Sequence, residues 1–352
     1  MRIPTRWDEV TPEWMTAALH VSSSGARVGA VELLWQSDGN NRRARFGLTY
    51  AEGSGPEIVF VKAEGNYRET HARNGNLFNE VRLLGSGVPL HLDHPATYAA
   101  LIDEPALDWL VVMEDVTRRG ADPRDSTRPY TIEQVTNGVL GLAAMHARFW
   151  RLTARSEPRL AWVRTWGDST EFTEVLRGGA ARGLERMTGL MPPELDGCSS
   201  DYFVDQFARY LTVLGRDPLT FLHGDAHIGN TYVLPDDSVG FLDWQVAHRG
   251  NWSQDVGYFV QGALVPADRR AAERGLIENY RTTLDRGLSA DDAWTWYRAS
   301  PVWGLAMWLA TLGSDGGSQP FDVCQALVHR HAVAAVELDA HAALDQIAAR
   351  VS

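Results

Sequence analysis

The arrangement of hydrophobic and polar residues in the first third of the chain predicts β-strands. Two runs, RVGAVELLWQ and RRARFGLTYA, flank the polar turn SDGNN at residues 37–41 and predict a hairpin. A third strand, EIVFVK, ends on Lys62, and DWLVVMED predicts a buried strand that ends in acidic residues. In the segment LFNEVRLLG, Leu77, Val81 and Leu84 have helical spacing before a glycine, which predicts a helix.

From about residue 119 the pattern becomes helical. The segment TIEQVTNGVLGLAAMHARFW opens with Thr131 and Gln134 at the spacing of a capping box, and DYFVDQFARYLTVLG predicts another amphipathic helix. After residue 253 nearly the whole chain is predicted to be helical, with Pro301 expected to kink the segment WTWYRASPVWGLAMW. These patterns predict an α+β protein with a small β-rich lobe followed by a large, mainly helical lobe.

Composition narrows the possible classes of function. Hydrophobic content of 44% and charged content of 22% are typical of a globular protein. The start of the sequence has no signal-peptide pattern, and the apolar run at residues 301–313 is too short to span a bilayer, so we expect no membrane association. Two cysteines, Cys198 and Cys324, favour a reducing, cytoplasmic setting over a disulfide framework.

Charge bears on the partners that the protein can have. The net charge of −12 argues against nucleic-acid binding, which relies on basic surface. An anionic ligand would therefore need a local concentration of positive charge or a metal ion. No feature of the sequence indicates an obligate protein partner.

The basic residues are divided very unevenly between the two types. Lys62 is the single lysine among 33 basic residues. Lysine is a compact ammonium on a flexible stem, whereas arginine is a wide planar fork, so a site that needs a small cation in a tight space cannot take arginine. Composition alone leaves an accidental lysine possible, but a functional site would explain why this position escaped replacement.

The densest chemistry lies in FLHGDAHIGNTYVLPDDSVGFLDWQ, residues 221–245. The pattern predicts the end of a strand, a loop and two short strands, and such a hairpin would bring Asp243 back beside Asp225 and Asn230. Two carboxylates and an amide oxygen form a hard oxygen site that suits Mg²⁺. A structural interpretation, in which these aspartates only mark turns and cap a loop, is the alternative.

A second chemical interpretation uses the same segment. His223, Asp225 and His227 form an H-x-D-x-H pattern that could belong to a metal-dependent hydrolase. No second histidine-rich cluster of ligand spacing exists in the sequence, and a hydrolase would leave Lys62 and Glu80 unexplained. We expect His223 to support the loop backbone in preference to binding a metal.

Several of these motifs resemble those of one superfamily. HGDAHIGN resembles the H-x-D-x-x-x-x-N catalytic loop of the aminoglycoside phosphotransferase and kinase-like superfamily, and LDW resembles its metal-binding aspartate segment. Lys62 and Glu80 resemble the pair that anchors the nucleotide there. The segments LHGDAHIGN, MED and MHARFW are most similar to the ecdysteroid-kinase-like and choline-kinase-like branches. The resemblance extends, element by element, from about residue 28 to 265.

The resemblance implies a fold and an activity. It implies a bilobal protein-kinase-like fold, with a nucleotide-binding lobe at 1–113, a hinge at 114–118 and a catalytic and acceptor-binding lobe at 119–352. It implies an ATP- and Mg²⁺-dependent phosphotransferase that moves the γ-phosphate to a hydroxyl of a small molecule, such as a ringed alcohol, a sugar or an aminoglycoside-like compound. A catalytically silent nucleotide-binding pseudokinase is a further alternative.

Carried over residue by residue, the resemblance also implies roles for the side chains. Asp225 would orient the attacking hydroxyl and accept its proton. Asn230 and Asp243 would hold Mg²⁺ at the phosphates, while Lys62, steadied by Glu80, would pair with the α- and β-phosphates.

Other residues would complete the nucleotide site and support the catalytic loop. The Glu114 carbonyl and the Val116 N–H would contact adenine. Gly39 and Asn40 would lie beside the phosphates in a turn that carries one glycine, where protein kinases have Gly-x-Gly-x-x-Gly. Asp255 resembles the aspartate that braces the catalytic loop from the next helix.

The acceptor is the part of the reaction that the sequence determines least. Tryptophans cluster in the predicted helical lobe, either as core or as walls of a pocket: Trp294, Trp296, Trp303 and Trp308. Aromatic walls suit an uncharged or weakly charged ringed alcohol, whereas a polycationic sugar would need converging carboxylates. We therefore expect a ringed alcohol, with Trp296 or Trp303 in contact with it.

Overall fold

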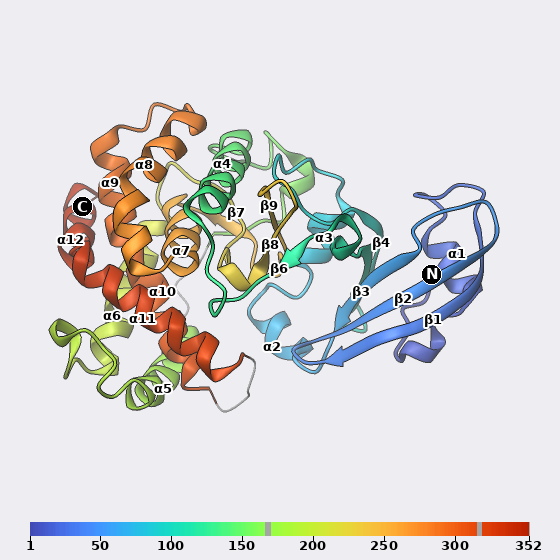
Figure 1. Ribbon diagram of the computed structural model, residues 1–352, viewed down its shortest axis with the longest axis horizontal. Helices are drawn as coiled ribbons and strands as arrows, with labels where there is room; N and C mark the ends of the chain where they lie inside the picture. Colours follow the sequence, from blue (N-terminus) through green and yellow to red (C-terminus); the bar gives the residue numbers. More distant parts are fainter. Residues whose placement is uncertain (166–169, 315–318, 352) are drawn as a thin grey trace. The chain divides into compact units, whose positions relative to one another are not determined.

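The computed structural model describes residues 1–165, 170–314 and 319–351, and the chain forms two compact units (Figure 1). Unit 1 comprises Met1–Pro89, His94–Ala121 and Leu242–Val246, and unit 2 comprises Leu90–Asp93, Asp122–Phe241 and Ala247–Ser352. Leu242–Val246, which we had expected in the second lobe, is therefore grouped with unit 1. The predicted hinge at 114–118 stays a prediction.

Unit 1 is built on a five-stranded antiparallel sheet in the order β1-β2-β3-β5-β4. Its strands are β1 (Arg27–Asp38), β2 (Asn41–Glu52), β3 (Ile58–Glu64), β4 (Thr97–Asp103) and β5 (Asp108–Glu114). The predicted hairpin, third strand and buried strand are confirmed as β1, β2, β3 and β5. Sequence reasoning missed β4, an edge strand with no fully buried residue and hence no strong hydrophobic pattern.

Short helices accompany this sheet. They are η1 (Trp7–Glu9), α1 (Pro12–Ala18), α2 (Arg68–Arg73), α3 (Asn79–Gly85) and η2 (Val116–Arg119). The predicted LFNEVRLLG helix is confirmed as α3, whose buried residues are Glu80, Val81, Leu83 and Leu84. The helix α1 begins after Thr11, whose hydroxyl accepts a hydrogen bond from the backbone N–H of Trp14.

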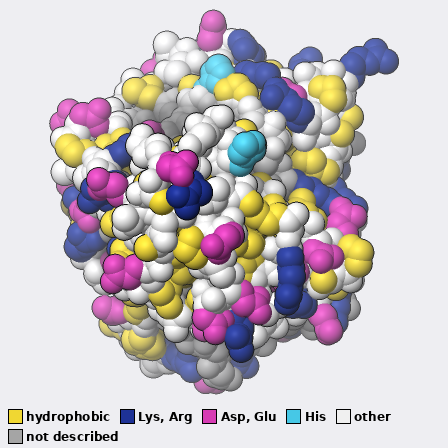
Figure 2. Space-filling model, turned by 90° about the vertical axis from the view of Figure 1, so that its right-hand side faces the viewer, with side chains coloured by type: hydrophobic (Ala, Val, Ile, Leu, Met, Phe, Trp, Pro, Cys, Tyr) yellow, Lys and Arg dark blue, Asp and Glu magenta, His cyan; other side chains and the backbone are white. Residues whose placement is uncertain are grey.

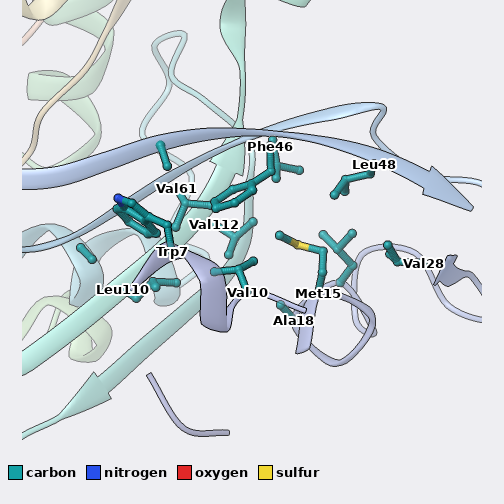
Figure 3. Packing of buried hydrophobic residues seen from close by; sticks show 14 of the residues in the cluster. Trp7, Val10, Met15, Ala18, Val28, Phe46, Leu48, Val61, Leu110 and Val112 are labelled. Atoms are coloured by element: carbon teal, nitrogen blue, oxygen red, sulfur yellow. The ribbon is translucent and has the colours of Figure 1, made fainter. Parts of the chain in front are cut away.

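The N-terminal segment buries one face of the sheet (Figure 3). Trp7, Val10 and Met15 pack against strand residues that include Phe46 and Val61. Because side chains alternate along a strand, the neighbours of these strand residues point to the opposite face. The register pairs Arg43 of β2 with Lys62 of β3, which places both on that opposite face.

Unit 2 is mainly helical (Figure 1). Its longer helices are α4 (Ile132–Arg148), α5 (Thr170–Arg186), α6 (Ser200–Leu214), α7 (Ser253–Ala263), α8 (Pro266–Leu284), α9 (Ala290–Ala299), α10 (Pro301–Leu312), α11 (Phe321–Glu337) and α12 (Ala340–Val351). Two small sheets, β10-β7 and β6-β8-β9, accompany them. The prediction of an α+β fold with a β-rich N-terminal part and a helical C-terminal part is confirmed.

The short elements of unit 2 include those of the motif-rich segment 221–245. They are β6 (Asp122–Pro123), η3 (Pro158–Leu160), η4 (Pro193–Leu195), β7 (Thr220–Leu222), η5 (Ile228–Asn230), β8 (Thr231–Val233), β9 (Val239–Phe241) and β10 (His248–Gly250). The predicted pair of short strands is confirmed as β8 and β9, with Thr231 opposite Phe241.

Two local sequence signals in unit 2 had different outcomes: the predicted capping box is confirmed, whereas the predicted proline kink is not. The capping box of α4 is present, because Thr131 and Gln134 each accept a hydrogen bond from the other's backbone N–H at 3.2 Å. The predicted kink at Pro301 is wrong. The helix α9 ends at Ala299 and α10 begins at Pro301, so the proline occupies the first turn of a new helix, where its missing N–H costs nothing.

The tryptophans of these two helices differ in burial. Trp303 and Trp308 are 2% and 3% exposed, whereas Trp294 and Trp296 are half-buried. The ring of Trp303 lies 5.1 Å from that of Phe207 on α6. Trp303 is therefore a core residue of unit 2, which corrects the expectation that it contacts an acceptor.

None of the helices in the described ranges is long and apolar enough to cross a membrane. Figure 2 shows one face of the molecule, over which acidic, basic and apolar side chains are interspersed. On that face, binding of an anion would depend on particular side chains more than on a broad basic surface.

Candidate functional site

Unit 1 brings three of the predicted site residues together. The Nζ of Lys62 lies 2.6 Å from Oε2 of Glu80 and 2.9 Å from Oδ1 of Asp243. The side chains of Lys62 and Glu80 are 6% and 3% exposed, while that of Asp243 is 37% exposed. The lone lysine is thus buried against two carboxylates, of which only Asp243 reaches solvent.

Separate elements position these three side chains. Lys62 projects from the sheet face that the N-terminal segment leaves uncovered, and Glu80 lies in the first turn of α3. The backbone N–H of Trp244 donates to Oε1 of Glu80 at 3.4 Å, which ties α3 to the segment that carries Asp243. Asp243 itself has φ of +61°, a conformation that is costly for a residue other than glycine and that often occurs at functional sites.

The electrostatics of the cluster favour a charged lysine. Burial acts to lower the pKa of Lys62, but attraction by the Asp243 and Glu80 carboxylates outweighs it and holds that pKa above its usual value. Burial raises the pKa of Glu80, and Lys62 opposes this effect. The raised pKa of Lys62 keeps the proton on its ammonium group, which donates a short, charge-assisted hydrogen bond to Glu80.

The predicted adenine-contact segment follows β5 in the same unit. Glu114 ends β5, and its carboxylate is engaged by the Nε of Arg119 at 2.8 Å and by the backbone N–H of Ala96 at 3.2 Å. Val116 is buried and opens η2. Asp115 between them pairs with Arg45 at 2.7 Å. The acidic side chains of this segment are therefore engaged within the unit. Adenine bound beside the segment would contact the backbone groups of the segment.

Unit 2 brings Asp225 and Asn230 together at the loop after β7. The Nδ2 of Asn230 donates to the backbone carbonyl of Asp225 at 2.9 Å and to its Oδ2 at 3.0 Å. The Asp225 side chain remains 36% exposed. The loop thus presents a carboxylate that a solute can reach and that a neighbouring amide holds in place.

A buried carboxylate supports this loop from α7. The backbone N–H groups of His223 and Gly224 donate to the two oxygens of Asp255, at 2.7 and 2.9 Å. The Nε2 of His146 lies 3.3 Å from the same carboxylate. Burial alone would raise the pKa of Asp255, but its hydrogen bond with His146 and the other charges and donors around it lower that pKa below its usual value.

Sequence reasoning identified Asp255 but missed other residues that support the loop. Gln254 donates from Nε2 to the Gly224 carbonyl at 3.1 Å and is held in turn by His248 at 3.0 Å. His146 and Gln254 occupy two helices, α4 and α7, that are distant in sequence. The only available signal for either was the histidine within MHARFW, which marked the helix without giving the residue a role.

The geometry gives no support to the metallohydrolase hypothesis. The Nδ1 of His223 accepts from the backbone N–H of Asp225 at 3.2 Å, and the Nδ1 of His227 accepts from that of Gly229 at 3.0 Å. Within residues 1–165, 170–314 and 319–351, no group of three or more His, Cys, Asp or Glu side chains could hold a metal ion. Both histidines serve the loop backbone, as we expected for His223.

Each unit presents oxygen atoms of a kind that suits a hard cation. Because Nδ2 of Asn230 makes both contacts to Asp225, the amide oxygen is the atom of that side chain left for a cation. Asp243 combines a contact to Lys62 with exposure to solvent. Carboxylate and amide oxygens are the ligands that Mg²⁺ prefers.

A β-rich unit with a buried Lys–Glu pair, and a helical unit with an H-x-D loop braced by a buried aspartate, are features of the kinase-like class of folds. The profile of a family described as "Phosphotransferase enzyme family" matches residues 142–299, a little under half of the chain. The match includes Asp225, Asn230, Asp243 and Asp255. It confirms the predicted resemblance to the aminoglycoside phosphotransferase and kinase-like superfamily and supports a phosphotransferase of the small-molecule kinase kind.

Two of the solved structures that are similar in fold are those of a spectinomycin phosphotransferase and a choline kinase. The structure of a spectinomycin phosphotransferase in complex with ADP and spectinomycin aligns with a TM-score of 0.55 at 13% identity, covering 93% of this chain and 98% of that one. A choline kinase from Cryptosporidium parvum Iowa II aligns with a TM-score of 0.53 at 10% identity, covering 90% and 91%. At such identities the likeness concerns the fold alone. No curated protein matches the sequence.

Proposed function

We propose that this protein is an ATP- and Mg²⁺-dependent phosphotransferase that transfers the γ-phosphate to a hydroxyl group of a small molecule. The observation that carries the proposal is the Lys62–Glu80–Asp243 cluster of unit 1. With both carboxyls ionised, the three side chains carry a net charge of −1. A structural ion pair would need only one carboxylate, whereas a second, solvent-reaching carboxylate suits a metal ion that accompanies phosphates.

In this proposal Lys62 binds the phosphates of the nucleotide, and Glu80 holds the ammonium in place. Asp243 and Asn230 would supply oxygen ligands to Mg²⁺, which would contribute neutralisation of the charge on the phosphate oxygens. These residues belong to different units, so their assignment rests on the motif and on the geometry within each unit. Positioning and charge neutralisation are what phosphoryl transfer mainly requires of a protein.

Asp225 receives the acceptor hydroxyl. Its carboxylate is held by Asn230 and is exposed enough for a hydroxyl to approach. It would orient that hydroxyl and accept its proton as the oxygen attacks the γ-phosphorus. The backbone of the Asp225 loop is fixed by Asp255, which keeps the carboxylate in one position.

Backbone groups would complete the nucleotide-binding site. The Glu114 carbonyl and the Val116 N–H would contact adenine, and Gly39 and Asn40 would lie beside the phosphates. The use of ATP is supported by the ADP in the similar spectinomycin phosphotransferase structure. The free cysteines Cys198 and Cys324 favour a reducing, cytoplasmic setting.

The proposal also includes the chemical class of the acceptor. We favour an uncharged or weakly charged ringed alcohol. The half-buried Trp296 is the tryptophan of the α9–α10 segment that still supports this choice, because Trp303 belongs to the core. The similar structures are of enzymes whose names specify spectinomycin and choline, so amino sugars and choline analogues belong among the compounds to be tried.

An ADP-release assay tests the proposal. Purified protein is given MgATP and a panel of ringed and steroid-like alcohols, sugars, amino sugars and choline analogues, with and without EDTA. We expect ADP to form only with Mg²⁺ and an acceptor, and the phosphorylated acceptor to appear in equal amount. MgATP binding with no turnover on any acceptor would favour the pseudokinase alternative. Phosphate release from phosphate esters without ATP would favour the hydrolase.

A further inference from the structure

The sheet face that carries Lys62 holds two other side chains able to bind an anion. In the register of β2 and β3, Asn41 is opposite Glu64 and Arg43 is opposite Lys62. Since this pairing is regular from Asn41 to Gly47, Asn41 and Arg43 point to the same face of the sheet as Lys62. Asn41 follows directly after the turn of Gly39 and Asn40, and Arg43 lies two residues further along β2.

The side-chain amide of Asn41 contains a buried hydrogen-bond donor that has no acceptor among the described residues. The residue is 5% exposed, and its Nδ2 has no hydrogen-bond partner among the residues that the structure describes. Buried donors are almost always satisfied, and leaving one unmade is costly. The Nδ2 of Asn41 is therefore available to a hydrogen-bond acceptor outside the chain.

Arg43, unlike the neighbouring arginines Arg42 and Arg45, has no partner for its guanidinium among the described residues. Arg42 donates to the backbone carbonyls of Pro4, Thr5 and Glu64 on the opposite face. Arg45 is held by Asp115 and Thr117. Arg43 is exposed and has no ion-pair or hydrogen-bond partner within the described ranges.

The guanidinium of Arg43 lies against the turn of Gly39 and Asn40. A Cβ built on Gly39 would meet only Nη2 of Arg43, at 3.7 Å. The guanidinium of Arg43 therefore lies beside the turn of Gly39 and Asn40. The nearest acidic neighbour in the register, Glu64, is already engaged by the indole Nε1 of Trp109 at 2.7 Å and the backbone N–H of Gly65 at 3.1 Å.

We propose that Asn41 and Arg43 bind the phosphate oxygens of a nucleoside di- or triphosphate alongside Lys62. The two side chains supply the donors that a turn with a single glycine lacks, and the guanidinium adds a positive charge in a chain whose net charge is −12. The inference rests on the proposed function, because it assigns further ligands to the nucleotide of that reaction. It accounts for a buried unmade donor and an unengaged arginine with one ligand.

Calorimetric titration of Arg43→Ala with MgATP, MgADP and adenosine tests the arginine. We expect the Kd of both phosphorylated nucleotides to rise about 10- to 100-fold, because a charge-assisted hydrogen bond is lost, and that of adenosine to stay within about twofold. The matched control is Arg27→Ala, which removes an exposed arginine of β1 that pairs with Glu52 in the same sheet. Its affinities should match the wild type for all three ligands.

Asn41→Leu separates a ligand role from a structural one. Leucine is close to asparagine in size and removes the unsatisfied donor, so thermal stability should hold or rise while MgATP binds about tenfold more weakly. Asn41→Asp should weaken MgATP binding further, because it places a carboxylate beside the phosphates. Retained adenosine affinity shows that each variant is folded.

Two outcomes distinguish this inference from the proposed function. Wild-type protein that binds no nucleotide overturns both. Wild-type protein that binds MgATP, with Arg43→Ala and Asn41→Leu binding it equally well, overturns the inference and leaves the proposed function intact.

Discussion

The two units hold their functional side chains by different kinds of interaction. In unit 1, Lys62 is buried between two carboxylates, so the cluster consists of side-chain charges that hold one another. In unit 2, the Asp225 loop is held mainly by its backbone, through N–H groups of His223 and Gly224 that donate to the buried Asp255. One cluster fixes a charge and the other fixes a loop.

The difference predicts how each cluster fails. Removing one member of a buried ion pair leaves an uncompensated charge, which lowers stability and also alters the binding of a charged ligand. Removing Asp255 leaves buried backbone donors unmade, and its effect falls first on the stability of the fold. Asp225, which the second cluster positions, can be changed without disturbing either kind of support.

The largest expected effect is on the chemical step. Asp225→Asn should lower kcat about 10²- to 10⁴-fold, because the acceptor hydroxyl loses its base, while the Kd of MgATP changes less than about twofold. Single-turnover kinetics and calorimetry measure the two quantities. Asp243→Asn is the comparison from unit 1 and should instead weaken Mg²⁺-dependent nucleotide binding. If both variants bind and turn over like the wild type, the roles assigned to these aspartates are wrong.

The next effect is on stability. Asp255→Ala should lower the free energy of unfolding by about 2–5 kcal/mol, because two backbone N–H groups and His146 lose a buried partner. Urea unfolding measures the change. Asp236→Ala, in the exposed β8–β9 turn of the same unit, is the control and should change stability by less than about 1 kcal/mol. Equal losses in the two variants would show that Asp255 gives the loop no special support.

A smaller effect is expected from replacing the lone lysine by the residue that is common elsewhere in the chain. Lys62→Arg should raise the KM for MgATP about 10- to 100-fold, since a guanidinium is too wide to take the place of an ammonium 2.6 and 2.9 Å from two carboxylates. The reverse exchange, Arg27→Lys at an exposed pair, should have no effect. An arginine variant with the wild-type KM and kcat would make Lys62 an accident of composition.

The smallest effect is a pH dependence that separates the two clusters. The folded pKa of Asp255 lies below the ordinary value of 3.8, so its contribution to stability is present above about pH 4 and is lost as the pH falls through the folded pKa. The folded pKa of Lys62 lies above 10.5, so its contribution is present below that pH and is lost as the pH rises through the folded pKa.

Free energies of unfolding measured across the acidic range and the alkaline range test the direction of each pH dependence. The free energy by which the wild type is more stable than Asp255→Asn should fall below about pH 4, and the free energy by which it is more stable than Lys62→Met should fall above about pH 10.5. Narrowing of both differences at the same end of the pH scale would contradict the assigned charges.

Local sequence signals predicted much of the architecture. The hairpin of β1 and β2, the strands β3 and β5, and the capping box of α4 follow from residues that are near neighbours in sequence, since turns, periodicity and caps are local properties. The H-x-D loop was recognisable because its residues lie within one short segment. Pro301 was misjudged because a proline satisfies the same pattern inside a kinked helix and at the start of a new one.

What the sequence determined by itself is the set of chemical groups: one lysine, an H-x-D loop with Asn230, and two further aspartates in known order. Only the tertiary structure decided that Asp243 lies 2.9 Å from Lys62, that Asp255 receives the backbone of His223 and Gly224, and that Asn41 and Arg43 share the face of Lys62. The physical reason is distance along the chain. Strand register and the packing of α7 on the loop depend on contacts between remote residues, and no local pattern specifies which remote residues will meet.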